Sequence, residues 1–355
     1  MNDILRFLSD ALKSGDDAAF IRIVGHRGST PRTAGARMVV TRSGRVCGTI
    51  GGGPVDGAAH QGATKAFETG RSLVVKLDMP AGDAASAGMI CGGEVSFLCE
   101  YIPSDDIEAV RFFEQVEASV EAAGGKHRKQ VLCTEFDASE DTWTIRRRHL
   151  IDGSKPMDWA FPDAPLLQNR FPAADAVNGS ALVAVENRAY CLDVMERQQP
   201  LFIFGAGHVA KEVSDLALRV GFQSIVVDDR EEFANEIRFP PPAAVVLLDS
   251  FENGMQALSI DENSYVVIVT RGHLHDRVVL AQALKTRARY IGMIGSRRKR
   301  DSIYAALRQD GFTDRDIERV HSPIGVPIKT ETPEEIAVSI VAELIDCRAE
   351  KKQNG

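Results

Sequence analysis

The stretch Gly205-Ala206-Gly207-His208-Val209-Ala210 is a GxGxxA turn that directly follows an apolar run and directly precedes a helix-compatible segment. Its first glycine permits a tight turn, its second lets a pyrophosphate approach the backbone, and the small Ala210 lets a helix pack closely on a strand. The start of the helix offers free N–H groups to an anion. Asp228 and Asp229 end the next apolar run, where a ribose hydroxyl is normally bound. The pattern predicts a site for a nucleotide-like ligand. The alternative is a fold that kept the turn and lost the ligand.

A second cluster, made of Arg271, His273, His275 and Asp276, follows another apolar run. Such a group of side chains can bind a metal or a phosphate, or take a proton from a substrate. The alternative is a helix capped by Asp276 or His275, with the histidines in solvent. The position at the carboxyl end of a strand favours function, with His273 and His275 as candidate catalytic residues. Histidines two residues apart are a poor metal signature, so we expect no metal site.

A third cluster is the turn Gly295-Ser296-Arg297-Arg298-Lys299-Arg300. Basic residues at the start of a helix oppose the helix dipole unless a bound anion offsets them. The turn therefore predicts an anion cradle in which Gly295, Ser296, Arg297 and Arg298 contact a phosphate. The alternative is a basic face in solvent.

The N-terminal part contains three further unusual loops. Gly51, Gly52 and Gly53 are consecutive, which costs chain entropy and indicates that a ligand approaches the backbone there. Gly28-Ser29-Thr30-Pro31-Arg32 is a second such loop. A third places the thiol of Cys91 beside glycines, which makes Cys91 a candidate reactive residue.

The elements that must position these residues differ between the two parts of the chain. Residues 201–204, 224–227, 244–248, 265–269 and 290–294 are continuous apolar runs, typical of buried parallel strands, and helix-compatible segments separate several of them. We predict an α/β chain with a C-terminal Rossmann-like domain at residues 200–350, built on a five-stranded parallel sheet. Residues 1–199 predict a mixed α+β N-terminal domain, whose strand order the pattern leaves open. Gln198-Gln199-Pro200 marks the boundary.

Composition excludes several classes of protein. The net charge of −8 argues against a general nucleic-acid binder. No apolar run approaches the roughly 20 residues that a membrane span requires. The six cysteines form no CxxC pair, which is typical of free thiols in a reducing cytoplasm. We expect a cytoplasmic protein and, on general grounds, a homodimer.

Taken in order, these segments resemble the xanthine dehydrogenase accessory factor family (XdhC/CoxI). The N-terminal matches are Gly28-Ser29-Thr30-Pro31-Arg32, Gly35-Ala36-Arg37-Met38, Gly48-Thr49-Ile50-Gly51-Gly52-Gly53 and Cys91-Gly92-Gly93. The C-terminal matches are the three clusters above with Val227-Asp228-Asp229-Arg230, His321-Ser322-Pro323-Ile324-Gly325 and Glu331-Thr332-Pro333-Glu334-Glu335-Ile336-Ala337. The region from about Asp105 to Gln199 carries no recognised motif.

The resemblance implies a maturation factor more than a catalyst. It implies a protein that binds molybdenum cofactor, as molybdopterin or its dinucleotide form, and supports its sulfuration with a cysteine desulfurase. It also implies delivery to the apoenzyme of a xanthine-dehydrogenase-type molybdenum hydroxylase. Many members carry cysteine after the three glycines, where this chain has Pro54. Members commonly read Leu-Asp-Ile-Gly-Ala where this chain has Val326-Pro327-Ile328-Lys329-Thr330.

Two other functions remain open from the sequence. The GxGxxA turn by itself favours an NAD(P)-dependent oxidoreductase, in which Asp228 would favour NAD. No clear hydride-transfer site accompanies the turn. The third hypothesis is a sulfur carrier that holds a persulfide on Cys91.

Overall fold

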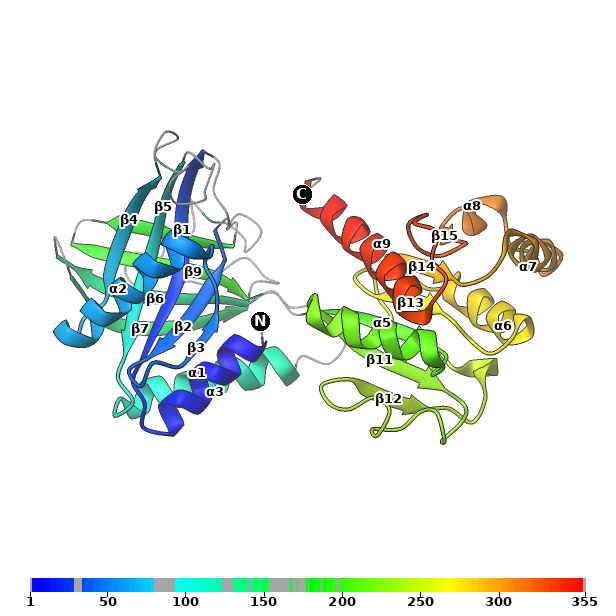
Figure 1. Ribbon diagram of the computed structural model, residues 1–355, viewed down its shortest axis with the longest axis horizontal. Coiled ribbons are helices and arrows are strands. Elements are labelled where there is room, and N and C mark those ends of the chain that lie inside the picture. The colour runs from blue at the N-terminus through cyan, green and yellow to red at the C-terminus, as the bar shows by residue number, and fades with distance from the viewer. Residues whose placement is uncertain are drawn as a thin grey trace. The chain divides into compact units, whose positions relative to one another are not determined.

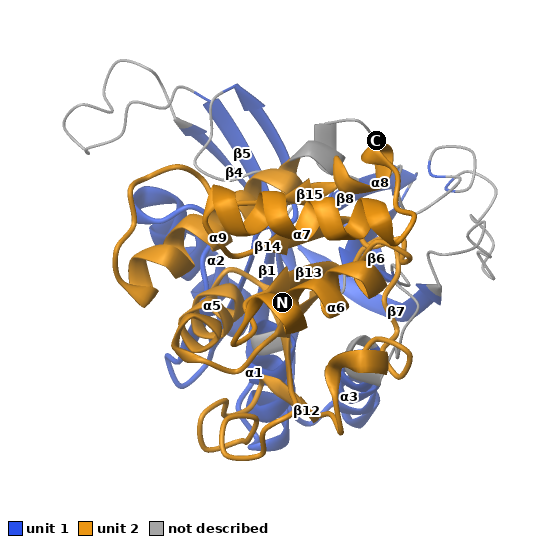
Figure 2. Cartoon of the chain, turned by 90° about the vertical axis from the view of Figure 1, so that its right-hand side faces the viewer, with its two compact units in different colours: residues 1–197 blue, residues 198–355 orange. Residues whose placement is uncertain are grey.

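The computed structural model describes residues 2–28, 34–79, 93–122, 130–139, 142–152, 167, 171, 177, 179–185, 187–195 and 198–353. The chain forms two compact units, residues 1–197 (unit 1) and residues 198–355 (unit 2), which Figure 2 shows in blue and orange. No helix in these described ranges is long and apolar enough to cross a membrane.

Unit 1 contains an antiparallel sheet with helices against it, as the mixed α+β prediction requires. The sheet has the strand order β3-β2-β1-β5-β4. Its strands are β1 (Ala18–Gly28), β2 (Arg37–Thr41), β3 (Val46–Gly48), β4 (Leu73–Met79) and β5 (Gly93–Ile102). The helices of this unit include α1 (Asn2–Lys13), α2 (Gly53–Thr69) and α3 (Ile107–Ala122). Ala59, Ala63 and Ala66 of α2 are buried against one face of the sheet.

A second antiparallel sheet of unit 1 faces the first. It has the order β7-β6-β9-β8. Its strands are β6 (Gln130–Ala138), β7 (Trp143–Asp152), β8 (Ser180–Val185) and β9 (Arg188–Met195). Charged side chains join the two sheets in the interior: Arg148 donates to Glu100 at 2.9 Å, and Arg37 donates to Asp193 at 2.9 and 2.7 Å. Arg22 pairs with Glu100 and is fully buried.

Unit 2 is a six-stranded parallel sheet with helices on both faces (Figure 1). Its strands are β10 (Gln199–Phe204), β11 (Phe222–Asp228), β12 (Ala244–Leu247), β13 (Tyr265–Ile268), β14 (Tyr290–Met293) and β15 (Val320–His321). The Rossmann-like prediction is confirmed, and the first five strands match the predicted runs. The count of five was wrong because β15 has only two residues, too few to give an apolar run.

The helices of unit 2 cover the sheet in two layers. On one face, α5 (His208–Arg219) and α9 (Pro333–Gln353) pack with Ile203, Val226 and Val267. On the other face, α6 (His273–Ala283) and α7 (Arg297–Gln309) pack with side chains that include Phe204 and Ile268. Neighbouring residues of each strand therefore serve opposite layers, which explains why the runs are apolar throughout.

The sheet has the strand order β12-β11-β10-β13-β14-β15. The chain adds β11 and β12 on one side of β10 and then β13, β14 and β15 on the other, so the order of connection reverses between β10 and β13. In open α/β sheets, ligands bind at the carboxyl ends of the strands beside such a reversal. All three predicted clusters of the C-terminal part follow strands β10, β13 and β14, so the topology brings them to one edge of the sheet.

Candidate functional site

The turn after β10 has the geometry that the sequence predicts for it. Gly205 has φ of +110°, and a Cβ atom there would lie 2.4 Å from the carbonyl oxygen of Val269, so only glycine fits. Gly207 is the N-cap of α5 and receives no side-chain cap. A Cβ atom on Gly207 would meet no atom within 4 Å. The first glycine is thus required by the fold, and the second leaves open space at the start of α5.

Two more helices start at the same edge. α6 follows Gly272, another N-cap without a side-chain hydrogen bond. α7 follows Ser296, whose hydroxyl accepts a hydrogen bond from Lys299 N at 3.3 Å, and Gly295 precedes it. The first turns of α5 and α6 therefore keep N–H groups that no capping side chain uses, and these groups attract anions.

Asp228, the predicted partner of a ribose hydroxyl, is turned inward at the end of β11 and is only 1% exposed. Its carboxylate accepts hydrogen bonds from Ala206 N at 2.7 Å and from Arg230 Nε at 2.9 Å and Nη2 at 3.0 Å. Asp228 therefore ties the glycine turn to the second strand.

Asp229 forms a two-pronged ion pair with Arg271, from Nη2 to Oδ2 at 2.8 Å and from Nη1 to Oδ1. This pair joins the loops after β11 and β13 across the reversal of strand order. The Arg271 guanidinium lowers the pKa of Asp229 to about 2. The predicted residues Asp229 and Arg271 thus hold each other in place at neutral pH.

The second cluster divides into a buried and an exposed part. Asp276 is fully buried, accepts a hydrogen bond from Thr270 N at 3.2 Å and pairs with the ammonium of Lys299. His273 is exposed on the first turn of α6, and the half-buried ring of His275 lies 5.3 Å from that of Phe251. Asp276 therefore fixes the start of α6 and α7, and the two histidines stand at the surface of that start.

His208 is the first residue of α5 and lies exposed beside the glycine turn. The histidines and carboxylates of this edge are spread over separate loops. Within the described ranges, no group of three or more His, Cys, Asp or Glu side chains could hold a metal ion.

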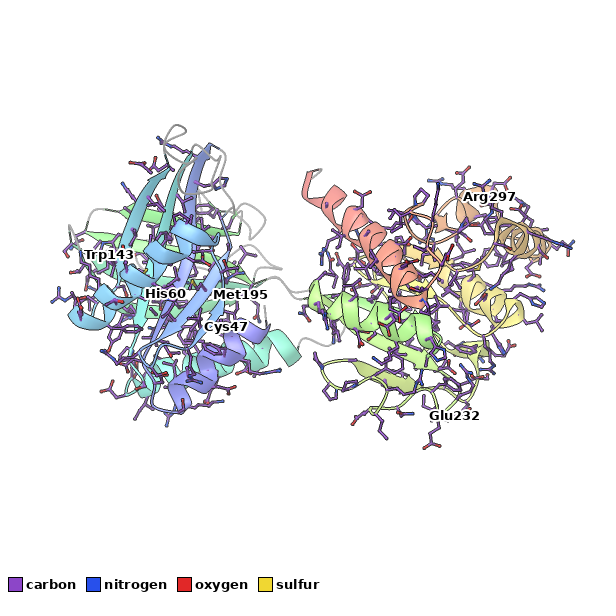
Figure 3. The ribbon with its side chains drawn as sticks, in the orientation of Figure 1. Cys47, His60, Trp143, Met195, Glu232 and Arg297 are labelled. Carbon is purple, nitrogen blue, oxygen red and sulfur yellow. The ribbon has the colours of Figure 1, made fainter. Side chains whose placement is uncertain are left out.

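The third cluster also divides. Lys299 is turned to Asp276, and Arg300 donates to Asp301 at 2.8 Å and to the carbonyl of Ser322 at 3.2 Å. Arg297 and Arg298 are exposed, and neither forms an ion pair within the part of the chain that the structure describes; Figure 3 shows Arg297 on α7. These two guanidinium groups remain free for an anion.

The glycines of unit 1 form a loop that satisfies part of its own backbone. Thr49 Oγ1 accepts hydrogen bonds from the amides of Gly51 and Gly52, both at 3.2 Å, and Asp56 accepts from Ile50 N at 3.0 Å. Gly53 begins α2. The backbone amides of Gly51 and Gly52, two of the three glycines expected to face a ligand, therefore donate hydrogen bonds within the loop itself. Cys91 and residues 29–32 lie outside the described residues.

The strand β15 and α9 hold a polar cluster to which the sequence assigned no role. Glu343 accepts hydrogen bonds from Tyr290 Oη at 2.5 Å and from Gly325 N at 2.8 Å, and lies 3.2 Å from His321 Nδ1. Burial acts to raise the pKa of Glu343, but these hydrogen bonds hold it below its usual range. The cluster fastens the loop after β15 to α9. His321 and Gly325 belong to the motif His321-Ser322-Pro323-Ile324-Gly325, and this motif was the feature of the sequence that could have indicated the cluster.

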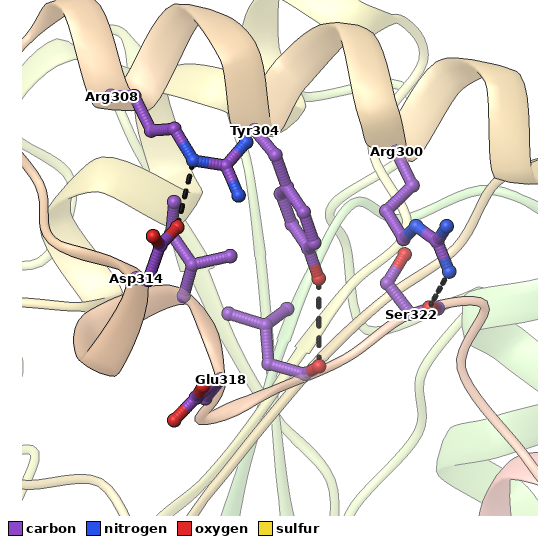
Figure 4. Close-up of a pocket in the computed structure, with 8 residues that line it drawn as sticks. Arg300, Tyr304, Arg308, Asp314, Glu318 and Ser322 are labelled. Atoms are coloured by element: carbon purple, nitrogen blue, oxygen red, sulfur yellow. Dashed lines mark hydrogen bonds and ion pairs between the residues drawn. The ribbon is translucent and has the colours of Figure 1, made fainter.

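A cavity of about 500 Å³ lies beside α7 (Figure 4). It is lined by Arg300, Tyr304, Arg308, Asp314, Ile317, Glu318, Val320 and Ser322. Several of its charged groups are paired with each other or with backbone: Arg308 donates to Asp314 at 2.8 Å, as the dashed line in Figure 4 marks. The cavity therefore offers few free polar groups.

Sequence reasoning missed two arginines beside the turn. Arg230 directly follows the predicted aspartates, and Arg238 donates to the carbonyl of Ala206 at 3.4 Å from a loop before β12. The pattern Asp-Asp-Arg after a strand was the signal for Arg230. Arg238 lies in no apolar run or motif, so only the fold brings it to the turn.

Comparison with known proteins places this geometry in a family. Residues 201–344 match the model of the XdhC Rossmann domain, and residues 11–78 match that of the XdhC and CoxI family. A solved structure described as a xanthine dehydrogenase from Bacillus halodurans has a TM-score of 0.77 to this chain, with 23% identity over 98% of this chain and 96% of the other. That likeness shows the fold.

Three relatives of known sequence cover almost the whole chain. "Uncharacterized protein YqeB" of Escherichia coli is 24% identical over 93% of this chain, which spans only 43% of that relative. A Bacillus subtilis protein named as a probable subunit of xanthine dehydrogenase is 27% identical over 98% of both chains. "Molybdenum cofactor insertion chaperone PaoD" of Escherichia coli is 22% identical over 99% of this chain and 90% of the relative. Both parts of the chain match models of one family, and this protein belongs to the XdhC and CoxI family.

Proposed function

We propose that this protein binds molybdenum cofactor as cargo and assists its sulfuration and its insertion into a xanthine-dehydrogenase-type molybdenum hydroxylase. One observation carries the proposal. The uncapped starts of α5 and α6 lie at the same edge of the sheet as Arg297 and Arg298, which form no ion pair within the part of the chain that is described. Two relatives support the choice of ligand, one named for xanthine dehydrogenase and one named as a molybdenum cofactor insertion chaperone.

The chemistry of this edge fits molybdopterin. Molybdopterin carries a phosphate, or a pyrophosphate in its dinucleotide form, and both are anions that helix N-termini and arginines bind. The pterin ring needs polar partners, which His208 and His273 can supply from the first turns of α5 and α6. The proposed cofactor-binding residues are Gly205, Gly207, His208, Asp228, Asp229, Arg271, His273, His275, Asp276, Gly295, Ser296, Arg297 and Arg298, with Gly51, Gly52 and Gly53 of unit 1.

The roles of these residues differ. Asp228, Asp229 and Asp276 act by holding the loops, because their carboxylates are engaged with protein groups. The free guanidinium groups of Arg297 and Arg298 contact the ligand itself. A cysteine desulfurase, the apoenzyme of the hydroxylase and a second copy of the chain are the proposed partners, in the cytoplasm.

An NAD(P)-dependent oxidoreductase is the second candidate. The strand order of unit 2 and the strict requirement for Gly205 favour it, because dinucleotide-binding folds share both. A carrier and a dehydrogenase differ in which of the two ligands they bind.

The test is anaerobic titration of the purified protein with molybdopterin, its cytidine dinucleotide form and NAD in parallel. We expect saturable binding of a molybdopterin species, weakened by Arg297→Gln and Arg298→Gln together. Arg219→Gln, at the far end of α5, is the matched control. Tight NAD binding without any molybdopterin signal would contradict the carrier function and lead to a dehydrogenase assay.

The role of Cys91 is tested in the same assay. A pure carrier keeps its cofactor affinity in Cys91→Ser, and loss of sulfuration in that variant at unchanged affinity supports a persulfide on this thiol.

A further inference from the structure

Three arginines converge on the glycine turn, Arg230 and Arg238 from the connection between β11 and β12 and Arg271 from the loop after β13. Arg230 and Arg271 both approach Asp228, with Arg230 Nε at 2.9 Å and Arg271 Nη1 at 3.8 Å from Oδ1. Arg238 Nη2 lies 3.4 Å from the carbonyl oxygen of Ala206. Since Ala206 also donates its amide to Asp228 at 2.7 Å, the hydrogen-bonded pair of Ala206 and Asp228 links all three arginines.

Phe233 orders two of these arginines. The guanidinium carbon of Arg230 lies 3.9 Å from the centre of its ring, and that of Arg238 lies 5.1 Å from it. An aromatic ring holds a guanidinium in place without using its N–H groups. Arg230 and Arg238 therefore keep donors for a further partner. Arg238 Nε is buried and has no hydrogen-bond partner in the described structure.

Asp228 has no room for a ribose. Its two oxygens accept four hydrogen bonds, from Ala206 N and from Arg230 N, Nε and Nη2, at 2.7 to 3.1 Å. A carboxylate has about four acceptor positions, so none is left for a sugar diol. Binding a diol there would require the displacement of Arg230 and would leave a buried charge unpaired.

The balance of charge favours an anion instead. Arg230 and Arg271 are paired to Asp228 and Asp229 beside the uncapped start of α5, and Arg238 directly contacts no carboxylate in the described part of the chain. The more distant charge of Glu232 also acts on Arg271. Glu231 and Glu232 follow Arg230, and Figure 3 shows Glu232 projecting outward from the rim of this unit. A phosphate monoester carries between one and two negative charges at neutral pH and three strong acceptor oxygens.

We propose that the subsite formed by Arg230, Arg238 and Arg271 binds a terminal phosphate monoester and rejects a ribose diol. This inference rests on the proposed function only for the identity of the ligand. In molybdopterin the single phosphate would occupy this subsite, and Arg297 and Arg298 would contact another part of the ligand. It reverses the expectation that Asp228 favours NAD, because the arginines occupy the place that the adenosine ribose of NAD would take.

The first experiment uses ligands that differ by one phosphate. Binding of NADP and NAD to the full-length protein is measured by calorimetry, with inorganic phosphate as competitor. We expect NADP to bind about 10- to 100-fold more tightly than NAD, the range that charge-assisted hydrogen bonds support. Equal binding of the two, or a preference for NAD, would overturn the inference.

The second experiment titrates molybdopterin under anaerobic conditions into wild type, Arg238→Gln, Arg271→Gln and the control Arg219→Gln. We expect each of the first two to lose about tenfold in affinity and the control to lose none. Circular dichroism shows whether each variant is folded. Because Arg238 Nη2 makes only a 3.4 Å contact with the turn, Arg238→Gln is the variant least able to disturb the fold.

The two experiments separate the two proposals. If NADP binds more tightly than NAD and molybdopterin does not bind, the phosphate subsite stands and the carrier function fails. If molybdopterin binds equally to wild type and both variants, the carrier function stands and the phosphate subsite fails. If no phosphate-bearing ligand binds at all, both are wrong.

Discussion

The two units use charged side chains in opposite places. Unit 1 buries Arg22, Glu100 and Asp193 between two sheets, where each of the three is fully buried. Unit 2 keeps its sheet interior apolar and gathers its charges at the carboxyl edge, where the Arg271 side chain is 37% exposed. The same kind of ion pair thus fixes the packing of two sheets in unit 1 and joins two loops at the sheet edge in unit 2.

The difference follows from what surrounds each pair. A charge in the interior must be fully paired, because an unpaired one costs several kcal/mol. A charge at the edge is screened by water and can exchange its partner for a ligand. Stability of the whole chain should therefore be most sensitive to the interior of unit 1, and ligand affinity to the edge of unit 2.

The largest effect is expected for Glu100→Gln. This change leaves the guanidinium groups of Arg22 and Arg148 beside each other in the interior without the carboxylate that holds both. We expect a loss of about 3–5 kcal/mol in the free energy of unfolding, measured by urea denaturation. Glu108→Gln, which changes an exposed glutamate of α3, is the control and should cost less than about 0.5 kcal/mol. Equal costs for the two would show that the buried pairs do not stabilise unit 1.

A smaller, pH-dependent effect is expected for Arg271→Gln. The pKa of Asp229 is lowered to about 2 in the folded protein, below its ordinary value, so the ion pair stabilises the fold above about pH 4. This contribution is lost as the pH falls from about 4 through 2. Allowing for the exposure of Arg271, we expect wild type to exceed the variant by about 1–2 kcal/mol at pH 7. A stability difference that is the same at pH 7 and at about pH 2 would contradict this linkage.

Arg297→Gln combined with Arg298→Gln should separate stability from binding. Both residues are exposed in the first turn of α7, where positive charge opposes the helix dipole. Their removal should leave stability unchanged or raise it by about 0.5–1 kcal/mol at low salt, while cofactor affinity falls. Thermal unfolding and anaerobic titration measure the two effects. A destabilised variant would indicate that the arginines hold the fold instead of a ligand.

The smallest effect concerns Lys329, which has φ of +57° in the loop before α9. Lys329→Gly relieves a left-handed conformation that costs about 1–2 kcal/mol but adds the chain entropy of glycine. We expect a net gain of about 0.5–1 kcal/mol in urea denaturation. A loss would mean that the lysine side chain stabilises the loop.

The sequence predicted the fold of unit 2 well because the relevant signals are local. Apolar runs located the strands β10 to β14, and the glycine turn located the start of α5. The two residues of β15 gave no run. The pairing of the two sheets in unit 1 depends on contacts such as Arg37 with Asp193, far apart in the chain, and no local pattern encodes them.

The sequence indicated which residue types gather at the site, but it did not indicate which way their side chains point. Asp228 and Asp276 were expected to face a ligand, but both are buried and hold protein groups, since hydrogen bonding to backbone amides decides where a carboxylate points. Arg238 entered the site through tertiary structure alone. Whether the proposed residues bind cofactor stays a prediction.

The helix α9 also has a consequence for the order in which the protein can be made. It packs on α5 with Ile340, Val341 and Leu344, yet more than a hundred residues separate the end of α5 from Pro333. At about 5–20 residues per second, the apolar surface of α5 waits at least about 5 s on the ribosome for its cover. Unit 1, complete by Arg197, can fold while unit 2 is still being synthesised. Unit 2 is thus the part of the nascent chain that most needs protection from aggregation.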